Sequence, residues 1–283
     1  MKISDFIAGN LQSLQNHYDK EEARTILETL VCDTLELKFR LSEADKGKQL
    51  LPTEVELLNK GVLSLSMGIP VQYVTGVAYF MDVVLKVDQY VLIPRPETEE
   101  LVELIIKRYH SKRNLTVLDV GCGSGCIGIQ LAHSLPGSQV TAVDTSEGAV
   151  KITEQNARMN GVEVVTTLAD VLTDPEKLKG EYDIIVSNPP YIHPSESDQV
   201  DDLVLKFEPH LALFTPTEDA LIFYRKILSL AKQYLKQEGS IFFEVNPEHN
   251  DELAHLVESH GWTFKIHVDI SGKSRMFEIG KKS

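Results

Sequence analysis

The stretch Asp-Ile-Ile-Val-Ser-Asn-Pro-Pro-Tyr, residues 183–191, decides the fold of this chain. Its isoleucines and valine predict a buried strand, and the two prolines end that strand because neither has a backbone N–H. Asn188 adds a side-chain carbonyl and an NH2 group, and Pro189 and Pro190 keep carbonyl acceptors in a stiff turn. Two acceptors beside the ring of Tyr191 suit a planar group with two hydrogens on one nitrogen. The alternative is an ordinary strand-terminating turn, for which Asn-Pro is common.

The composition limits the architecture and the partners. With 283 residues, 42% of them hydrophobic and 25% charged, the chain can form one large core and one small appended core. The net charge of -14 argues against a protein that neutralises many phosphates, so a protein or small-molecule partner is expected and direct nucleic-acid binding is not. No apolar run approaches the roughly 20 residues of a membrane span, and the polar start is unlike a signal peptide. We therefore expect a cytosolic monomer without membrane contact.

The three cysteines indicate a reducing compartment. Cys32, Cys122 and Cys126 are odd in number and include no C-x-x-C pair. The histidines and acids show no spacing typical of a metal site. We expect neither a disulfide nor a bound metal.

Residues 1–72 are predicted to form a small helical bundle. Asp19 with Glu22, and Thr53 with Glu56, have the spacing of an N-cap and its partner, and each pair precedes apolar residues at helical intervals. Such a bundle is either a packing appendage or a docking domain for the substrate.

Residues 73–96 are predicted to form a β-hairpin that links the bundle to the rest of the chain. The segment is rich in β-branched and aromatic residues, with Met81 and Asp82 near its turn. The prolines at its end exclude strand, and the acidic residues that follow favour the first turn of a helix over 97–109.

From residue 114 onward strands and helices alternate, which predicts a parallel sheet covered by helices on both faces. The ligand of such a sheet binds at the carboxyl ends of the strands, where Gly121, Asp144, Asp170 and Asn188 fall. The predicted strands are 115–120, 139–144, 164–170, 182–187, 240–245, 262–268 and 276–279, and the helices are 126–134, 146–160, 220–236 and 250–260.

A glycine-rich loop follows the first strand of this sheet and opens a helix. Its sequence is Gly121-Cys122-Gly123-Ser124-Gly125, and its glycines let a ligand approach the backbone and the helix N-terminus. Residues 123–128 also match the dinucleotide pattern G-x-G-x-x-G, so a nicotinamide dehydrogenase is an alternative. Asp144 is placed to bind a ribose in either case.

Three features favour S-adenosyl-L-methionine over a dinucleotide. Asp119, just before the loop, would face a cationic amino-acid end better than a pyrophosphate. Asp170 can accept from an adenine amino group, and the loop has no Arg or Lys for phosphate charge. Residues 188–191 add a site for a nitrogen nucleophile at the same crevice.

These motifs carry a family resemblance. Residues 117–125, Val-Leu-Asp-Val-Gly-Cys-Gly-Ser-Gly, together with Asn-Pro-Pro-Tyr at 188–191, resemble a class I methyltransferase. The segment Val-Leu-Ile-Pro-Arg-Pro-Glu-Thr-Glu at 91–99, with Phe-Glu-Pro at 207–209 and Asp-Ile-Ser-Gly at 269–272, resembles the HemK/PrmC family of release factor glutamine methyltransferases. The resemblance runs from about residue 70 to the end.

The resemblance implies an α/β fold with a Rossmann-like sheet of seven strands, mostly parallel with the last antiparallel, over a methyltransferase domain at 97–283. It implies methyl transfer from S-adenosyl-L-methionine, leaving S-adenosyl-L-homocysteine, to the glutamine amide in the GGQ loop of peptide chain release factors. An amino-methylating DNA enzyme and a non-catalytic adenosyl-binding module remain alternatives. The expected cofactor-binding residues are Gly121, Cys122, Gly123, Ser124, Gly125, Asp144, Asp170, Val171 and Asn188. The expected substrate-binding residues are Asn188, Pro189, Pro190 and Tyr191, of which Asn188, Pro189 and Tyr191 are expected to be catalytic.

Overall fold

The computed structural model describes residues 1–38 and 40–281, and the chain forms two compact units. The first unit contains residues 1–77 and 202–207, and the second contains residues 78–201 and 208–283. The chain thus returns to the first unit for one short helix, which the sequence analysis did not foresee. The last two residues of the predicted 97–283 domain lie outside the described residues.

The first unit is helical, as the sequence predicts. Helix α2 begins after the predicted N-cap Asp19, whose carboxylate accepts 2.9 Å hydrogen bonds from the N–H groups of Glu21 and Glu22. The predicted N-cap Thr53 is wrong: Pro52 takes the first helical position, where its missing N–H is harmless, and Leu51 is the N-cap. The helices of this unit are α1 (Ile3–Asn10), α2 (Lys20–Thr34), α3 (Glu43–Lys46), α4 (Pro52–Ser66), α5 (Val71–Thr75) and α9 (Asp202–Phe207).

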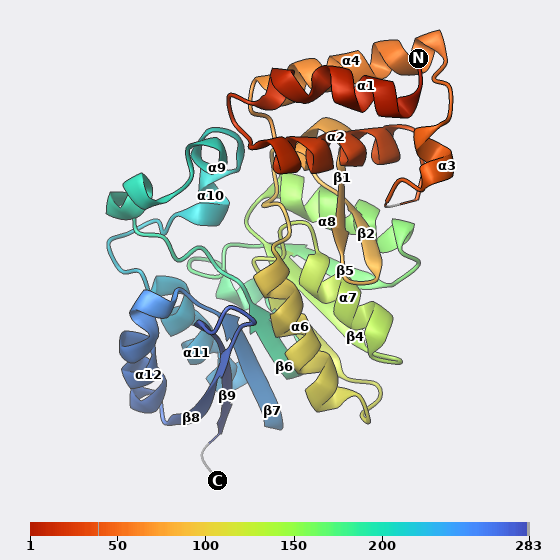
Figure 1. Ribbon diagram of the computed structural model, residues 1–283. Helices are drawn as coiled ribbons and strands as arrows, with labels where there is room; N and C mark the ends of the chain where they lie inside the picture. The colour runs from red at the N-terminus through yellow and green to blue at the C-terminus, as the bar shows by residue number, and fades with distance from the viewer. Residues whose placement is uncertain (39, 282–283) are drawn as a thin grey trace. The chain divides into compact units, whose positions relative to one another are not determined.

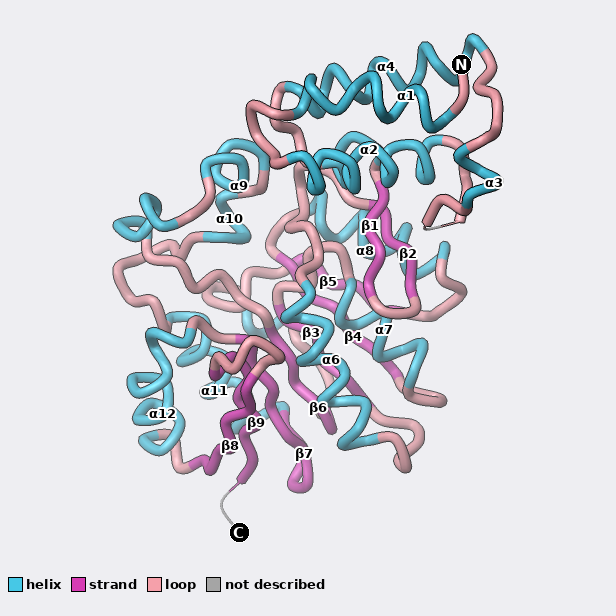
Figure 2. The backbone as a smooth tube through the Cα atoms, viewed as in Figure 1, coloured by secondary structure: helices cyan, strands magenta, loops and turns pink. Residues whose placement is uncertain are grey.

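The linking hairpin is shorter than predicted. Its strands are β1 (Val77–Phe80) and β2 (Val83–Lys86), with Met81 and Asp82 in the turn as expected. Residues 71–75 form α5 instead of strand, and the residues after β2 form a loop. The hairpin is a separate two-stranded sheet, which Figure 2 shows in magenta above the main sheet.

Side chains of α8 (Glu147–Met159) and its C-cap complete the open edge of β2. Asn156 accepts from the N–H of Lys86 at 2.7 Å and donates to its carbonyl at 2.9 Å, and Asn160 pairs in the same way with Val84. A two-stranded hairpin is marginal by itself, and these amides supply the ladder bonds that another strand would give.

The second unit has the predicted seven-stranded sheet, in the order β5-β4-β3-β6-β7-β9-β8. The first five strands in this order are parallel, and β9 is antiparallel to both of its neighbours. The prediction of a mostly parallel sheet with an antiparallel last strand is confirmed (Figure 1). The strands are β3 (Thr116–Val120), β4 (Gln139–Asp144), β5 (Val164–Leu168), β6 (Tyr182–Ser187), β7 (Leu235–Glu244), β8 (Trp262–Val268) and β9 (Ser274–Lys281).

Successive residues of the central strands point to opposite faces, so each face has its own core. Ile184 and Phe242 lie in the cluster with α6 (Pro96–Tyr109), α7 (Cys126–Ser134) and the hairpin. Ile185 and Phe243 lie in the cluster with α11 (Ile222–Tyr234) and α12 (Asn250–Ser259). In Figure 1 the yellow and green helices cover one face and the blue helices the other. The remaining helices are α10 (His210–Leu213) and the short 3-10 turns Leu11–Leu14, Pro175–Lys177, Pro194–Gln199 and Pro247–His249.

The junction between α11 and β7 shows the largest difference from the predicted boundaries of this unit. Helix α11 ends at Tyr234 and β7 begins at Leu235, whereas the sequence predicts helix to 236 and strand from 240. Gly239, taken as a helix stop, lies inside β7 beside a register shift, where an added Cβ would come within 3.0 Å of the Asp183 carbonyl. Over the ranges 1–38 and 40–281, no helix combines the length and the apolar character that crossing a membrane requires.

Candidate active site

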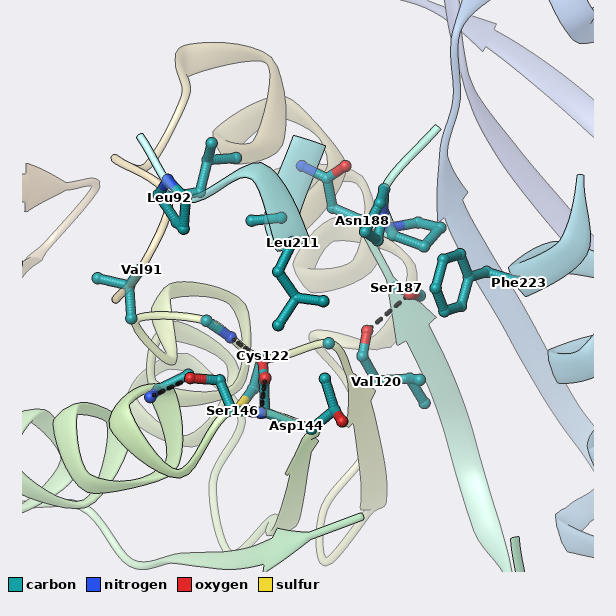
Figure 3. Close-up of a pocket in the computed structure, with 18 of the residues that line it drawn as sticks. Val91, Leu92, Val120, Cys122, Asp144, Ser146, Ser187, Asn188, Leu211 and Phe223 are labelled. Carbon is teal, nitrogen blue, oxygen red and sulfur yellow. Dashed lines mark hydrogen bonds between the residues drawn. The ribbon is translucent and has the colours of Figure 1, made fainter. Parts of the chain in front are cut away.

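A cavity of about 600 Å³ lies in the second unit at the carboxyl ends of the parallel strands. This volume is typical of a small-molecule site. Figure 3 shows three of its residues: Cys122 from the loop after β3, Asp144 at the end of β4, and Asn188 from the turn after β6. Of the predicted site residues, Gly125 and Tyr191 are not among those that line the cavity. Those that do are Gly121, Cys122, Gly123, Ser124, Asp144, Asp170, Val171, Asn188, Pro189 and Pro190.

The glycine-rich loop presents its backbone to the cavity. Gly121 and Gly123 have φ values of +74° and +54°, which side chains disfavour, and a Cβ on either would meet no atom within 4 Å. The N–H groups of Gly121 and Cys122 both donate to the Val143 carbonyl, which fixes the loop against β4. Gly125 has a different role. It is the N-cap of α7, and an added Cβ there would clash with the side chain of Ile129.

Asp144 holds the glycine loop and the start of α8 together at the cavity wall. Its two carboxylate oxygens accept from the N–H groups of Gly123 at 2.9 Å and Ser146 at 2.8 Å. Burial raises the pKa of Asp144, and these two backbone donors lower it. Each oxygen retains a further lone pair, so the carboxylate suits a pair of neighbouring hydroxyl groups.

Little positive charge is available at this cavity. Among the described residues Arg95 is the one Lys or Arg that lines it, and its guanidinium pairs with the buried carboxylate of Glu208. Asp170 contributes a carboxylate that accepts from the N–H of Leu172 at 2.8 Å. The site therefore suits an adenosyl group without phosphates better than a pyrophosphate.

The expectation that Asp119 faces the ligand is not met. Asp119 is completely buried and does not line the cavity. Its Oδ2 accepts from the N–H of Gly128 at 3.0 Å, and Oδ1 has no partner among the described residues. Its side chain turns to the first turns of α7 beneath the loop, and burial raises its pKa to about 7.

Asn188 and Pro189 form the polar end of the cavity. The side chain of Ser187 donates to the Val120 carbonyl at 2.6 Å, which pins the end of β6 to β3. The Asn188 NH2 group donates to Thr98 Oγ1 at 3.1 Å. Neither Asn188 Oδ1 nor the Pro189 carbonyl accepts a hydrogen bond from any described residue. Two residues that line the cavity thus each have an acceptor that no described residue occupies.

Tyr191 lies deeper than the sequence indicates. Its ring packs against the core cluster of α11 and α12, and burial raises the pKa of its phenol to about 12. Phe223 of α11 lies near Ser187 and Asn188 in Figure 3, and it lines the cavity together with the rings of Tyr90 and Phe214.

The sequence analysis missed two further segments of the wall. Residues 89–95, interpreted as hairpin strand, form a loop that lines the cavity, and Val91 and Leu92 of this loop face it in Figure 3. Residues 209–217 contribute several more lining residues, including Leu211. The prolines at 94 and 96 end the hairpin as predicted, but they do not indicate that the residues before them line a cavity.

The comparisons with known proteins agree with this geometry. Residues 98–212 match the family model described as "Methyltransferase small domain". The chain is 37% identical to the release factor glutamine methyltransferase of Flavobacterium psychrophilum over 287 residues, covering 99% of each chain. It is 37% identical to the enzyme of that name from Bacteroides thetaiotaomicron (95% of this chain, 97% of the relative) and 38% identical to that from Lactococcus lactis (92% and 98%). On this identity and coverage, the chain belongs to the release factor glutamine methyltransferase family.

Proposed function

We propose that this protein methylates the side-chain amide nitrogen of the glutamine in the Gly-Gly-Gln loop of a peptide chain release factor. The names of the relatives indicate the protein substrate. The observation that carries the chemistry is the pair of unpartnered acceptors, Asn188 Oδ1 and the Pro189 carbonyl, at one end of the cavity. A primary amide has two hydrogens on one nitrogen and matches such a pair.

S-adenosyl-L-methionine is the cofactor of this methyltransferase, and the cavity residues fit it. The backbone of Gly121 and Gly123 leaves open space where side chains would stand, Asp144 would hold the ribose hydroxyls, and Asp170 would accept from the adenine amino group. The bound cofactor supplies a methyl group on a positively charged sulfur, and S-adenosyl-L-homocysteine is its product. Cys122, Ser124 and Val171 complete this part of the wall, and Gly125 supports it from the start of α7.

The protein's part in the chemistry is to hold a weak nucleophile. The lone pair of an amide nitrogen is delocalised, and burying its NH2 group without partners would cost about 2 to 7 kcal/mol. Asn188 Oδ1 and the Pro189 carbonyl would accept one hydrogen each, while Pro190 stiffens the turn. Fixing the reacting atoms in this way is worth about 7 to 11 kcal/mol in favourable cases.

No strong base is needed. A methylated amide nitrogen is cationic and acidic, so its extra proton can pass to water. Tyr191, partly buried and with its phenol pKa raised to about 12, stays protonated at neutral pH and serves as a supporting side chain rather than a base.

The helical unit is proposed to dock the release factor. Its helix α4 exposes Leu57 and Leu63 by 53% and 64%, and the C-cap residue Met67 is exposed by 50%. Where such exposed apolar side chains form a contiguous patch, they mark a contact surface for another protein. This assignment gives the unit a function beyond packing.

Labelled S-adenosyl-L-methionine tests the proposal. The enzyme is incubated with an intact release factor, with one whose loop glutamine is replaced, and with duplex DNA. We expect label on the intact factor alone, no transfer by Asn188→Ala, and full transfer by the control Asn160→Ala, which changes the C-cap of α8 outside the cavity. Label on DNA or on the glutamine-free factor would contradict the proposal, as would cofactor binding without any transfer.

A further inference from the structure

Three side chains form a hydrogen-bonded chain behind the acceptor pair. Glu244 at the end of β7 accepts from Thr98 Oγ1 at 2.6 Å, and Thr98 accepts from Asn188 Nδ2 at 3.1 Å. Thr98 and Glu244 are each only 3% exposed. Residues from α6, β7 and the turn after β6 therefore meet in one polar line inside an apolar surrounding, where an unmade hydrogen bond is expensive.

The direction of donation along this chain is determined by chemistry. An ionised carboxylate can only accept, and a threonine hydroxyl has a single hydrogen. Because that hydrogen goes to Glu244, Thr98 can only accept from its other neighbour. Asn188 must therefore turn its NH2 group to Thr98, which leaves Oδ1 without a partner.

We infer that Thr98 and Glu244 are positioning residues that hold the Asn188 side chain with its oxygen, not its nitrogen, available to the substrate. The inference rests on the proposed function, in which that oxygen accepts a hydrogen of the glutamine NH2 group. The two ends of an asparagine amide are nearly identical in shape, so packing alone selects neither. Only a directed hydrogen bond distinguishes them.

The orientation also determines which substrate the site accepts. With Oδ1 presented, Asn188 and the Pro189 carbonyl are two acceptors and match an NH2 group. With the amide turned over, an NH2 group would oppose the NH2 group of the substrate, and the site would instead suit a carboxylate. Thr98 and Glu244 thus select glutamine over glutamate.

The charge of Glu244 is sensitive to pH near neutrality. Burial is the main cause that raises its pKa to about 7; Glu97 also raises it, whereas the hydrogen bond from Thr98 and the charges of Arg275 and Arg95 lower it. The neutral groups near it are the phenols of Tyr191 and Tyr224 and the thiol of Cys126. Tyr224 donates to the backbone carbonyl of Glu244 at 2.9 Å, so its hydroxyl hydrogen does not go to the carboxylate.

Protonation of Glu244 removes the fixed direction of hydrogen-bond donation along this chain of side chains. A protonated Glu244 can donate to Thr98, and the threonine hydrogen is then free to turn to Asn188. Because the carboxylate form is required, the fixed orientation is present above a pH of about 7 and is lost as the pH falls through that value.

Kinetics of four variants test the inference. Thr98→Val keeps the shape and removes the hydroxyl, Thr98→Ser restores it, and Glu244→Gln removes the charge. Thr263→Val, on the exposed face of β8, is the matched control. We expect Thr98→Val to lower kcat by about 10- to 100-fold, the rate equivalent of leaving a buried group unpaired, with cofactor affinity kept within about twofold. Thr98→Ser should recover most of the lost kcat. The kcat of the wild type should fall below pH 7, and that of Glu244→Gln should not.

A second measurement does not depend on activity. The side-chain NH2 resonances of Asn188, assigned by their absence in Asn188→Asp, should be slow to exchange in the wild type and should shift with a midpoint near pH 7. Thr98→Val should make their exchange fast, and Glu244→Gln should abolish the shift. If both variants leave these resonances unchanged, the inference is wrong even where the release factor is methylated. If the wild type methylates no release factor, the proposed function fails and the resonances still decide the orientation.

Discussion

The backbone N–H of Gly123 donates a 2.9 Å hydrogen bond to the carboxylate of Asp144. This contact joins the loop after β3 to the end of β4, although the two residues are 21 positions apart. A side chain that is proposed to bind the cofactor therefore also holds the backbone that borders it.

Asp144→Ala is expected to weaken S-adenosyl-L-methionine binding by about 1.5 to 3 kcal/mol, because the ribose hydroxyls lose a charged acceptor. The loop also loses the bond to Gly123. Calorimetry measures the dissociation constant. Glu147→Ala is the control, since that exposed carboxylate pairs only with Lys151 on the surface of α8. Equal dissociation constants for Asp144→Ala and the wild type would place Asp144 away from the cofactor.

Asp119 makes the folded protein sensitive to pH. Its pKa is raised to about 7 by burial, against about 4 in an unfolded chain. The folded state therefore holds the proton more tightly, and this contribution to stability is complete below about pH 4 and is lost as the pH rises through about 7.

Asp119→Asn removes that titration. Relative to the wild type, the free energy of unfolding of the variant should rise by up to about 1.4 kcal/mol for each pH unit between the two pKa values. Urea denaturation of both proteins without cofactor, across this pH range, measures the difference. A difference that is constant with pH would show that Asp119 does not titrate there.

Asn156→Ala is expected to destabilise the second unit by about 1 to 3 kcal/mol. The buried amide of Asn156 donates to the carbonyls of Lys86 and Ser124 and accepts from the N–H of Lys86. Its loss would leave backbone groups of both the hairpin and the glycine loop without their hydrogen bonds. In chemical denaturation Asn160→Ala should cost less, because that side chain is part-exposed and contacts only the hairpin and its own helix. Equal losses would mean that the bond to Ser124 contributes little.

Deletion of residues 1–77 is expected to leave cofactor binding intact, since every residue that lines the cavity belongs to the second unit. Helix α9 should lose its order, because Leu203 packs on Gly68 of the deleted part. Hydrogen exchange would show fast exchange at 202–207 and a protected sheet. Methylation of the release factor should fall, and transfer at the full rate would mean that the helical unit does not dock it.

The elements that could be predicted are those whose signals are local. Strand, glycine loop and helix follow one another within 116–134, so the position of the cofactor loop at the end of β3 is contained in one stretch of sequence. The end of β6 is also determined locally, because the prolines that follow it cannot continue a strand inside a sheet.

The features that could not be predicted depend on distant partners. Thr98 and Glu244 are 146 positions apart and become neighbours only when α6 packs across the sheet. The open edge of β2 is completed by Asn156, which lies 70 positions beyond Lys86. Because that partner is not visible in the local sequence, the apolar residues after β2 read as a continuation of the strand. The direction of the Asp119 side chain depends on the position of α7 after the loop, and the residue pattern of the strand carries no information about that position.

The return of the chain to the first unit for α9 determines the order of assembly during synthesis. Residues 78–201 separate the two parts of this unit, and they include strands β3 to β6. At about 5 to 20 residues per second, α9 leaves the ribosome roughly 6 to 25 seconds after residue 77, so the bundle waits unfinished while strands β3 to β6 are made. The two units therefore cannot fold strictly one after the other from the N-terminus.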